Sequence, residues 1–258
     1  MSAIALEGVT VTLGDRPVVD DVDVRIAEGE WVALIGPNGA GKTTMLRAIA
    51  GLVPFDGAIA IHGTSTSAMH RRELARTVAV VPQAPSTPSW MTVGEYVLLG
   101  RTPHLGALAR EGAADYLAAT RALERLDLLG FRDRLLGTLS GGEKQRAVVA
   151  RALAQEAGIV ILDEPTAALD IGHQQQALEL LDDLRGESGL TLLAAMHDLT
   201  LAAQYADRMV LLDAGRIVAD GPPADVLTQG LIAAHYAASI EVVDVAGRIA
   251  IVPARPAR

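Results

Sequence analysis

Eight consecutive residues have the composition of a loop that binds phosphate. The run Gly36-Pro37-Asn38-Gly39-Ala40-Gly41-Lys42-Thr43 has Gly, four free positions and then Gly-Lys-Thr in the order of the phosphate loop. Glycines let the backbone curl so that successive N–H groups converge on an anion, and a helix that starts here adds its positive end. We predict that Lys42 reaches the β- and γ-phosphates of a nucleotide, that the Thr43 hydroxyl binds magnesium, and that Thr44 completes the site at the helix start. A plain glycine-rich turn is the alternative.

Two adjacent carboxylates, Asp163 and Glu164, follow an aliphatic run at 159–162. Four branched aliphatic residues predict a buried parallel strand, and α/β sheets bind ligands beyond the carboxyl ends of such strands. In a phosphate-loop protein the first acid holds magnesium, and the second can polarise the attacking water as general base. Ordinary solvated acids would explain one of these residues, but the upstream phosphate loop favours the catalytic interpretation.

The string Leu139-Ser140-Gly141-Gly142-Glu143 predicts a helix start with a second role. Ser140 and Glu143 have the spacing of a capping box. The two glycines weaken a helix but leave bare N–H groups that an anion can approach closely. Because the chain already has one phosphate loop, we expect this helix end to serve a nucleotide held by another subunit.

The elements that must position these residues form a predicted α/β core. Residues 31–35 predict a buried strand that enters the phosphate loop, and residues 44–50 a helix that leaves it. Upstream, residues 3–26 predict antiparallel strands, because Val22, Val24 and Ile26 alternate with charged residues. We expect further helices at 69–76, 141–155 and 173–185, and further strands at 58–61, 78–81, 159–162, 191–196, 209–212 and 216–219.

A helical segment interrupts this core at about 84–138. Prolines punctuate its start, residues 92–95 have the spacing of a capping box, and residues 111–129 predict an amphipathic helix. The apolar stripe of that helix is expected to contain Leu117, Leu123, Leu126 and Leu129.

The predicted fold class is therefore α/β. A phosphate-loop NTPase core, mainly parallel sheet with flanking helices, would carry an N-terminal antiparallel β-subdomain and the inserted helical subdomain. We predict one nucleotide-binding domain over residues 1–253, with a β-hairpin at about 240–252 and a frayed tail at 254–258.

Composition restricts the possible functions. Half of the 258 residues are apolar, which suffices for a sizeable core, and the net charge of −9 argues against a general nucleic-acid binder. The chain has no cysteine, so disulfide and thiol chemistry are excluded. The N-terminus does not have the pattern of a signal peptide, and no apolar stretch approaches the roughly 18 residues that span a bilayer. We expect a cytosolic chain without a membrane span.

Taken together and in this order, the motifs resemble those of ATP-binding-cassette (ABC) ATPases. They are GPNGAGKT at 36–43, LSGGE at 139–143, ILDEPTAALD at 161–170 and a histidine, His197, after a strand. The resemblance extends from about residue 3 to the C-terminus, and LSGGE distinguishes this family from other phosphate-loop NTPases. It implies a head-to-tail homodimer in which two ATP molecules, with Mg²⁺, lie between the phosphate loop of one subunit and the LSGGE helix of the other.

The resemblance also gives roles to single residues. It implies that Gln83 senses magnesium and the attacking water, that Asp170 crosses the dimer interface, and that His197 contacts the γ-phosphate. Ser140 and Gly142, flanked by Gly141 and Glu143, would meet the γ-phosphate of the other subunit. Taken alone, Gln83 would be a polar residue at a strand end and His197 a buried or capped histidine. Only their order relative to the other motifs reverses both interpretations.

Two positions depart from the family pattern. An aromatic residue usually stacks on adenine near the end of the first strands, and that position is Leu13 here. Leucine covers one face of adenine without ring stacking, so we expect looser base selectivity. Ala167 replaces the usual serine, which removes one polar contact across the dimer.

Two further segments are similar to the ATPases of metal-chelate importers, which take up iron–siderophores, haem or cobalamin. They are VLLGRTPH at 97–104 and LDIGHQQQ at 169–176. The resemblance implies that residues 85–105 dock a cytoplasmic helix of a permease. Trp90, Met91 and Tyr96 would form that apolar surface or, equally, would pack inside the helical subdomain. Histidines 62, 70, 104 and 173 lack metal-site spacing, and we expect them on the surface.

The resemblance thus implies an ATP-hydrolysing motor subunit at the cytoplasmic face of the cell membrane. Its partners would be a second copy, two transmembrane permease subunits and, indirectly, an extracytoplasmic substrate-binding protein, but no nucleic acid. An exporter ATPase is the main alternative, because cassette motifs do not encode direction. A cassette ATPase that acts on nucleic acid or ribosomes is disfavoured by the acidic charge. The cargo is not encoded in this chain.

Overall fold

The computed structural model describes residues 1–106, 108–166, 169–236, 238–245 and 247–254. Ala167, where the sequence departs from the family pattern, and residues 255–258 of the predicted tail lie outside these ranges. No helix within them is long and apolar enough to cross a bilayer.

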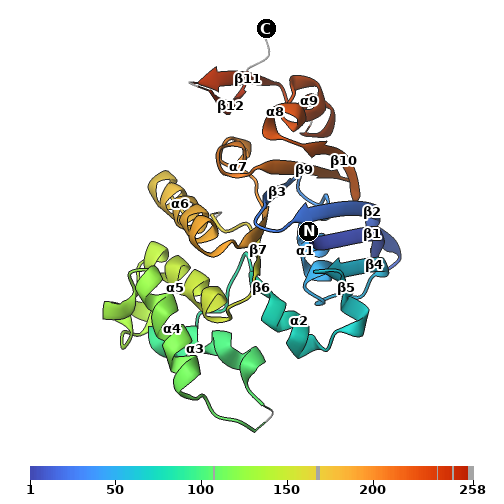
Figure 1. The fold of residues 1–258 in the computed structure, drawn as a ribbon. Coiled ribbons are helices and arrows are strands. Elements are labelled where there is room, and N and C mark those ends of the chain that lie inside the picture. Colours follow the sequence, from blue (N-terminus) through green and yellow to red (C-terminus); the bar gives the residue numbers. More distant parts are fainter. Residues whose placement is uncertain (107, 167–168, 237, 246, 255–258) are drawn as a thin grey trace.

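A six-stranded sheet forms the centre of the molecule (Figure 1). Its order is β10-β9-β3-β8-β7-β6, and all neighbours are parallel except β9 and β10. The strands are β3 (Trp31–Ile35), β6 (Val78–Val81), β7 (Ile159–Asp163), β8 (Thr191–Ala195), β9 (Arg208–Asp213) and β10 (Arg216–Gly221). Every residue of β3, β7 and β8 is buried, as expected for parallel strands that are covered on both faces.

Alternate residues of the central strands face two apolar clusters. In β3, Val32 and Leu34 pack with α1 (Lys42–Ile49) and the N-terminal strands, whereas Trp31, Ala33 and Ile35 pack with the helices of the other face. Those helices are α5 (Gly141–Ala154), α6 (Ile171–Ser188), α7 (Leu199–Tyr205), α8 (Pro223–Val226) and α9 (Gln229–Tyr236), and α2 (Arg71–Thr77) precedes β6. The sequence placed the start of α6 two residues late, because Asp170 caps this helix.

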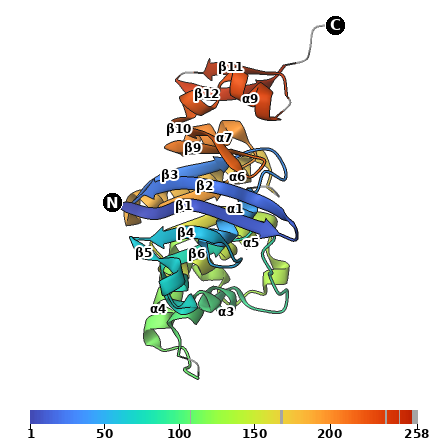
Figure 2. The same cartoon turned by 90° about the vertical axis from the view of Figure 1, so that its right-hand side faces the viewer.

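A second, antiparallel sheet with the order β2-β1-β4-β5 lies beside α1 (Figure 2). Its strands are β1 (Ser2–Leu13), β2 (Arg16–Ala27), β4 (Asp56–Ile61) and β5 (Thr64–Ser65). Val22, Val24 and Ile26 are buried while the charged residues between them are exposed, so the predicted alternation is confirmed.

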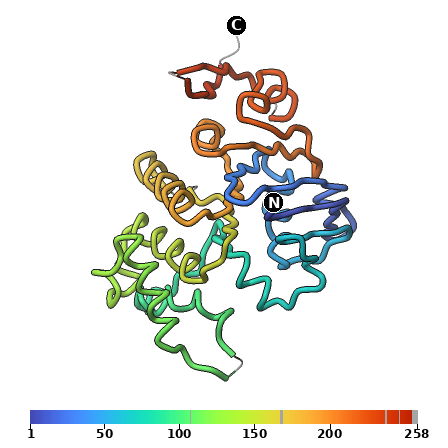
Figure 3. The backbone as a smooth tube through the Cα atoms, viewed as in Figure 1, coloured from blue at the N-terminus to red at the C-terminus, as the bar shows by residue number. Residues whose placement is uncertain are grey.

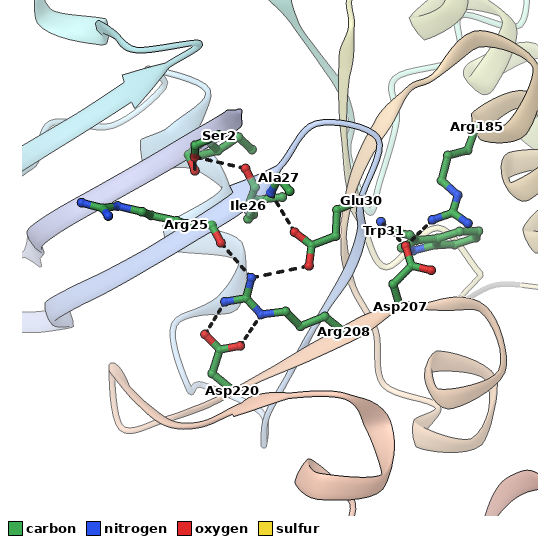
Figure 4. Close-up of polar contacts among 11 residues, drawn as sticks. Ser2, Arg25, Ile26, Ala27, Glu30, Trp31, Arg185, Asp207, Arg208 and Asp220 are labelled. Atoms are coloured by element: carbon green, nitrogen blue, oxygen red, sulfur yellow. Dashed lines mark hydrogen bonds and ion pairs between the residues drawn. The ribbon is translucent and has the colours of Figure 1, made fainter.

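A hydrogen bond joins the two sheets near the start of β3, and ion pairs hold the residues around it (Figure 4). The Arg208 guanidinium donates to the Arg25 carbonyl oxygen at 2.8 Å and to both carboxylate oxygens of Asp220, at 2.5 and 2.6 Å. Asp207 accepts from the Trp31 N–H at 2.9 Å and pairs with Arg185 of α6. The Asp207 contact with Trp31 thus holds the start of β3, the strand that leads into the phosphate loop.

The segment between β6 and α5 is helical, as predicted. It contains α3 (Val93–Leu98), α4 (Ala113–Arg125) and three 3₁₀ segments, η2 (Leu99–His104), η3 (Leu129–Phe131) and η4 (Leu136–Thr138). The expected stripe of leucines on α4 is half wrong, because Leu117 is 50% and Leu129 43% exposed. The helix buries a face of alanines with Leu123 instead, since small residues allow close approach to its neighbours, and it ends at Arg125, before Leu129.

The C-terminal strands β11 (Ile240–Val245) and β12 (Arg248–Pro253) form an antiparallel hairpin. The backbone trace shows this hairpin at one end of the molecule, with α3 and α4 at the opposite end (Figures 1 and 3). The hairpin packs on α7, where the Ile251 N–H donates to Thr200 Oγ1 at 3.0 Å.

Candidate nucleotide-binding and catalytic site

The phosphate loop follows β3 and closes around its own lysine. Gly36, Gly39 and Gly41 have φ angles of 149°, 83° and 105°, which L-residues rarely adopt. Lys42 Nζ donates to the carbonyl oxygens of Gly36 and Pro37 at 2.6 and 3.1 Å. An ammonium group has three N–H donors, so one remains available for an anion in the loop.

Backbone donors line the same loop. The first intrahelical bond of α1 runs from the Met45 N–H to the Gly41 carbonyl oxygen at 2.9 Å. Within the described ranges, the N–H groups of Lys42, Thr43 and Thr44 donate to no acceptor, as expected at a helix N-terminus that awaits an anion. The pocket above them is lined by Val18, Asn38, Gly39, Ala40, Gly41, Lys42, Thr43, Thr44, Glu164 and His197.

Sheet topology brings the other predicted residues to this pocket. Strands β3, β8, β7 and β6 are parallel neighbours, so their carboxyl ends meet at one edge. The phosphate loop follows β3, His197 follows β8, and Asp163 and Glu164 end β7. Gln83 follows β6, the edge strand of this group.

Asp163 and Thr43 provide oxygen atoms that suit a magnesium ion. Thr43 Oγ1 donates to Asp163 Oδ1 at 2.9 Å. Burial raises the pKa of Asp163, and the charge of Glu164 adds to this effect. Burial likewise lowers the pKa of Lys42. Mg²⁺ prefers a hydroxyl and one or two carboxylates, completed by water and phosphate oxygens, so these residues fit the ion.

Glu164 lies between two partners that hold its carboxylate. Gln83 Nε2 donates to Glu164 Oε2 at 2.5 Å, and His197 Nε2 pairs with Glu164 Oε1. The Glu164 side chain is only 12% exposed, and its backbone has φ = 52°, in the left-handed region that non-glycine residues seldom occupy. The structure therefore brings Gln83, Glu164 and His197 into direct contact.

The LSGGE segment lies outside this pocket. The capping box is present, with Glu143 N–H donating to Ser140 Oγ at 3.3 Å and Ser140 N–H to Glu143 Oε2 at 2.7 Å. The hydrogen bond from the Ser140 N–H keeps the pKa of Glu143 below its ordinary value. Ser140 and Gly141 are exposed. Gly142 faces the ring of His173. The backbone N–H of His173 donates to Asp170 Oδ1 at 2.9 Å, and its ring Nδ1 lies 2.8 Å from the same oxygen.

Comparison with known proteins assigns the family. The sequence profile described as ABC transporter matches residues 19–167, more than half of the chain. The chain belongs to the ABC transporter family.

The relatives of this ABC ATPase span nearly its whole length. The hemin import ATP-binding protein HmuV of Streptomyces coelicolor is 45% identical over 92% of this chain and 84% of its own. The ferric enterobactin transport ATP-binding protein FepC of Escherichia coli is 40% identical over 96% and 92%. Among solved structures, a metal-chelate type ABC transporter in an inward-facing conformation superposes with a TM-score of 0.85, 26% identity and coverage of 99% and 98%.

The candidate nucleotide pocket of this ABC ATPase includes one residue that sequence reasoning missed. Val18 lines the pocket, and its carbonyl oxygen would lie 2.4 Å from a Cβ at Gly41. Leu13, predicted to cover adenine, lies at the turn between β1 and β2, is 50% exposed and is not among the residues that line the pocket. Nothing local in the sequence marks Val18, because its position depends on the bulged pairing of β1 with β2.

Two placements were open for Trp90, Met91 and Tyr96, and packing inside the helical segment holds for Met91 and Tyr96, whereas permease docking stays a prediction. Tyr96 is fully buried and accepts a hydrogen bond from Arg151 Nη1 at 3.3 Å, so it packs inside the helical segment. Met91 packs against the core, whereas Trp90 is 72% exposed. Of the four histidines expected on the surface, His104 is half-buried, and its Nε2 contacts the Gln155 carbonyl oxygen at 2.9 Å.

Proposed function

We propose that this ABC ATPase is the motor subunit of an importer, in which ATP binding and hydrolysis at a head-to-tail homodimer drive uptake of a metal chelate through separate permease subunits. One observation carries the proposal. A phosphate loop, a carboxylate pair, a glutamine and a histidine converge at one sheet edge, while an exposed glycine-rich helix end lies outside that pocket.

Within one subunit, we assign the chemistry to the residues at the sheet edge. Lys42 and the free N–H groups of the phosphate loop would bind the phosphates of ATP. Glu164 would take a proton from the attacking water, since its carboxylate lies beside the phosphate loop. Gln83 and His197 hold that carboxylate from both sides and would orient the water and the γ-phosphate.

Thr43 and Asp163, with Gln83 at the rim of the site, would hold Mg²⁺. The bound ion would neutralise phosphate charge during transfer. Asp163 is well suited to this because its carboxylate is buried beside Glu164, and an added cation would offset their mutual repulsion.

The second subunit would complete the site. Ser140, Gly141, Gly142 and Glu143 present a helix end whose first two N–H groups donate to no acceptor in the described part of the chain. We assign this end to the γ-phosphate held by the partner subunit, as the free donors and the positive helix terminus favour an anion. Asp170, exposed at the start of α6 close to Gly142, would cross the same interface.

We infer the transport partners from the names of the relatives. Two transmembrane permease subunits would bind the ATPase at the cytoplasmic face of the cell membrane, and an extracytoplasmic binding protein would deliver the cargo. The names of the hemin and enterobactin proteins support haem or an iron–siderophore as cargo, and cobalamin belongs to the same chemical class of metal chelates. Trp90, exposed on the helical segment, would contribute to the permease contact. The excess of acidic residues supports a protein that does not bind nucleic acid.

The Glu164→Gln variant tests the assignment of the base. The amide keeps the size of the side chain but cannot accept a proton, so kcat should fall by about 10²–10⁴-fold while ATP binding is retained. The ATP-bound dimer should then accumulate in size-exclusion chromatography. Glu179→Gln, an exposed carboxylate on α6, is the matched control and should leave kcat unchanged. Turnover by Glu164→Gln near the parent rate would rule out this role for Glu164.

A further inference from the structure

Two residues in the middle of the segment Leu99–His104 (η2), Gly100 and Arg101, are buried. Gly100 lies so close to α5 that a Cβ would be 2.2 Å from the Arg151 carbonyl oxygen. The next residue, Arg101, is 6% exposed, although arginine is seldom buried. A buried guanidinium needs hydrogen-bond partners for its N–H groups, and those partners show which elements Arg101 links.

Arg101 joins the start of one helix to the end of another. Its Nη1 donates to the Ala154 carbonyl oxygen at 2.8 Å and to Glu156 Oε2 at 2.7 Å. Its Nε donates to Asp115 Oδ1, in the first turn of α4, at 3.0 Å. The last carbonyl groups of a helix lack intrahelical partners and carry partial negative charge, so the cation both caps α5 and complements its dipole.

The same helix end is tied to the strand that carries Gln83. Gln155, which caps α5, donates through Nε2 to the carbonyl oxygens of Ala75 and, at 2.9 Å, Val78. Val78 begins β6, and Gln83 follows that strand. His104 of η2 contacts the Gln155 carbonyl oxygen. The C-terminal end of α5 is therefore a junction of the helical segment and the catalytic sheet.

The opposite end of α5 is the LSGGE helix start. The helix has 14 residues and is thus about 21 Å long, with Ser140 as its N-cap. A helix moves as a rigid element, so a change of orientation at Ala154 displaces Ser140 and its glycines. A lysine would not replace Arg101, because only the planar fork reaches Asp115, Ala154 and Glu156 together.

We propose that Arg101 is a positioning residue that fixes the direction of α5, so that Ser140 and Gly142 meet the nucleotide of the partner subunit. This inference rests on the dimer of the proposed function. Arg101 acts on closure of the dimer through α5, and it does not contribute to nucleotide binding by the phosphate loop of its own subunit.

Arg101→Met and Arg101→Lys, made in the full chain with Glu164→Gln, test the inference. Three quantities are measured for each variant: affinity for a fluorescent ATP analogue, the ATP concentration at which half of the protein is dimeric, and the melting temperature. Arg208→Met is the matched control, since Arg208 is a half-buried, ion-paired arginine that lies far along the chain, at the start of β9 (Figure 4).

Arg101→Met should bind the analogue as the parent does, and it should need about tenfold more ATP to dimerise. Arg101→Lys should lie between this variant and the parent, because it keeps the charge but not the fork. Arg208→Met should dimerise like the parent even where its melting temperature falls. This pattern separates positioning from a general loss of stability.

Three results would overturn the inference. Dimerisation of Arg101→Met at the parent ATP concentration would refute it, as would an equal shift in Arg208→Met. If Arg101→Met does not fold, the inference is tested with Arg101→Lys and Asp115→Asn instead. If both variants dimerise at the same ATP concentration as the parent, the inference is refuted. If Glu164→Gln alone fails to dimerise with ATP, the proposed dimer fails and this inference fails with it.

Discussion

Gly36 is the position at which the phosphate loop tolerates least change, and Gly36→Ala tests that geometry directly. The backbone there has φ = 149°, and an added Cβ would lie 2.0 Å from the Leu212 carbonyl oxygen. Leu212 belongs to β9, whose backbone is held by the neighbouring strands β3 and β10. The clash is between backbone and Cβ, so a change of rotamer cannot relieve it.

The expected loss of stability combines two effects. A non-glycine residue in such a backbone conformation costs about 1–3 kcal/mol. Displacing a hydrogen-bonded strand to accommodate the methyl group adds about 1–3 kcal/mol, the usual range for overpacking. We therefore expect Gly36→Ala to lower the free energy of unfolding by about 2–6 kcal/mol, which is large for a single substitution at most of that range.

Gly39→Ala is the matched control within the same loop. Its φ is 83°, but no atom lies within 4 Å of the added Cβ. Only the conformational cost remains, about 1–2 kcal/mol. Urea unfolding without nucleotide isolates the folding free energy from ATP binding, and the two variants should differ by about 2 kcal/mol, or roughly 4–8 °C in melting temperature.

Equal destabilisation of the two variants would refute this reasoning. It would mean that backbone conformation alone decides the cost, and that the contact between the phosphate loop and β9 is not as close as the structure has it. A Gly36→Ala variant that is as stable as the parent would refute the geometry of the loop itself.

Two further predictions concern the carboxylate pair and the capping boxes. Burial raises the pKa of Asp163, so from about pH 4 up to that raised value the folded chain holds a proton that the unfolded chain has lost, and stability falls as the pH rises through this window. Asp163→Asn should thus abolish ATPase activity yet raise the free energy of unfolding by about 1 kcal/mol at neutral pH. Below about pH 4 it should give no gain, and melting curves at neutral pH and below pH 4 check this. Ser140 and Thr92 cap their helices with the same geometry, so alanine at either position should cost about 1 kcal/mol, but only Ser140→Ala should lower kcat/KM, by about tenfold or more.

The candidate nucleotide site was predictable because each of its motifs carries its own local structure. The buried run 31–35, the glycines and Lys42 predict strand, loop and helix without knowledge of the rest of the fold, and the structure confirms all three. The strand before Asp163 was recognisable for the same reason, as branched aliphatic residues without alternation indicate a strand buried on both faces. Parallel neighbours then bring these motifs to one edge.

Residues whose role depends on distant contacts were not predictable. Val18 reaches the pocket through the register of a bulged hairpin, and Tyr96 is buried in an apolar cluster with Arg151 over its ring, 5.1 Å from the centroid. Arg101 is the clearest case. An arginine in a polar loop is expected in solvent, and its partner at Ala154 is 53 residues away in sequence. Only the assembled structure shows that Arg101 donates to a carbonyl oxygen at the C-terminal end of α5.

The backbone groups at both ends of α5 lack partners within the helix, and the chain satisfies them differently at the two ends. The C-terminal carbonyl groups meet Arg101, so the fold satisfies that end within the chain. At the N-terminal end, Ser140 caps only the Glu143 N–H, and within the described residues Gly141 and Gly142 keep free donors on an exposed surface. Free N–H groups at an exposed helix start attract anions, and the two glycines leave their approach open although they cost helix stability. The open end therefore argues for an anion that arrives from outside the chain, and the phosphate loop of a second copy is where the same sequence would hold one.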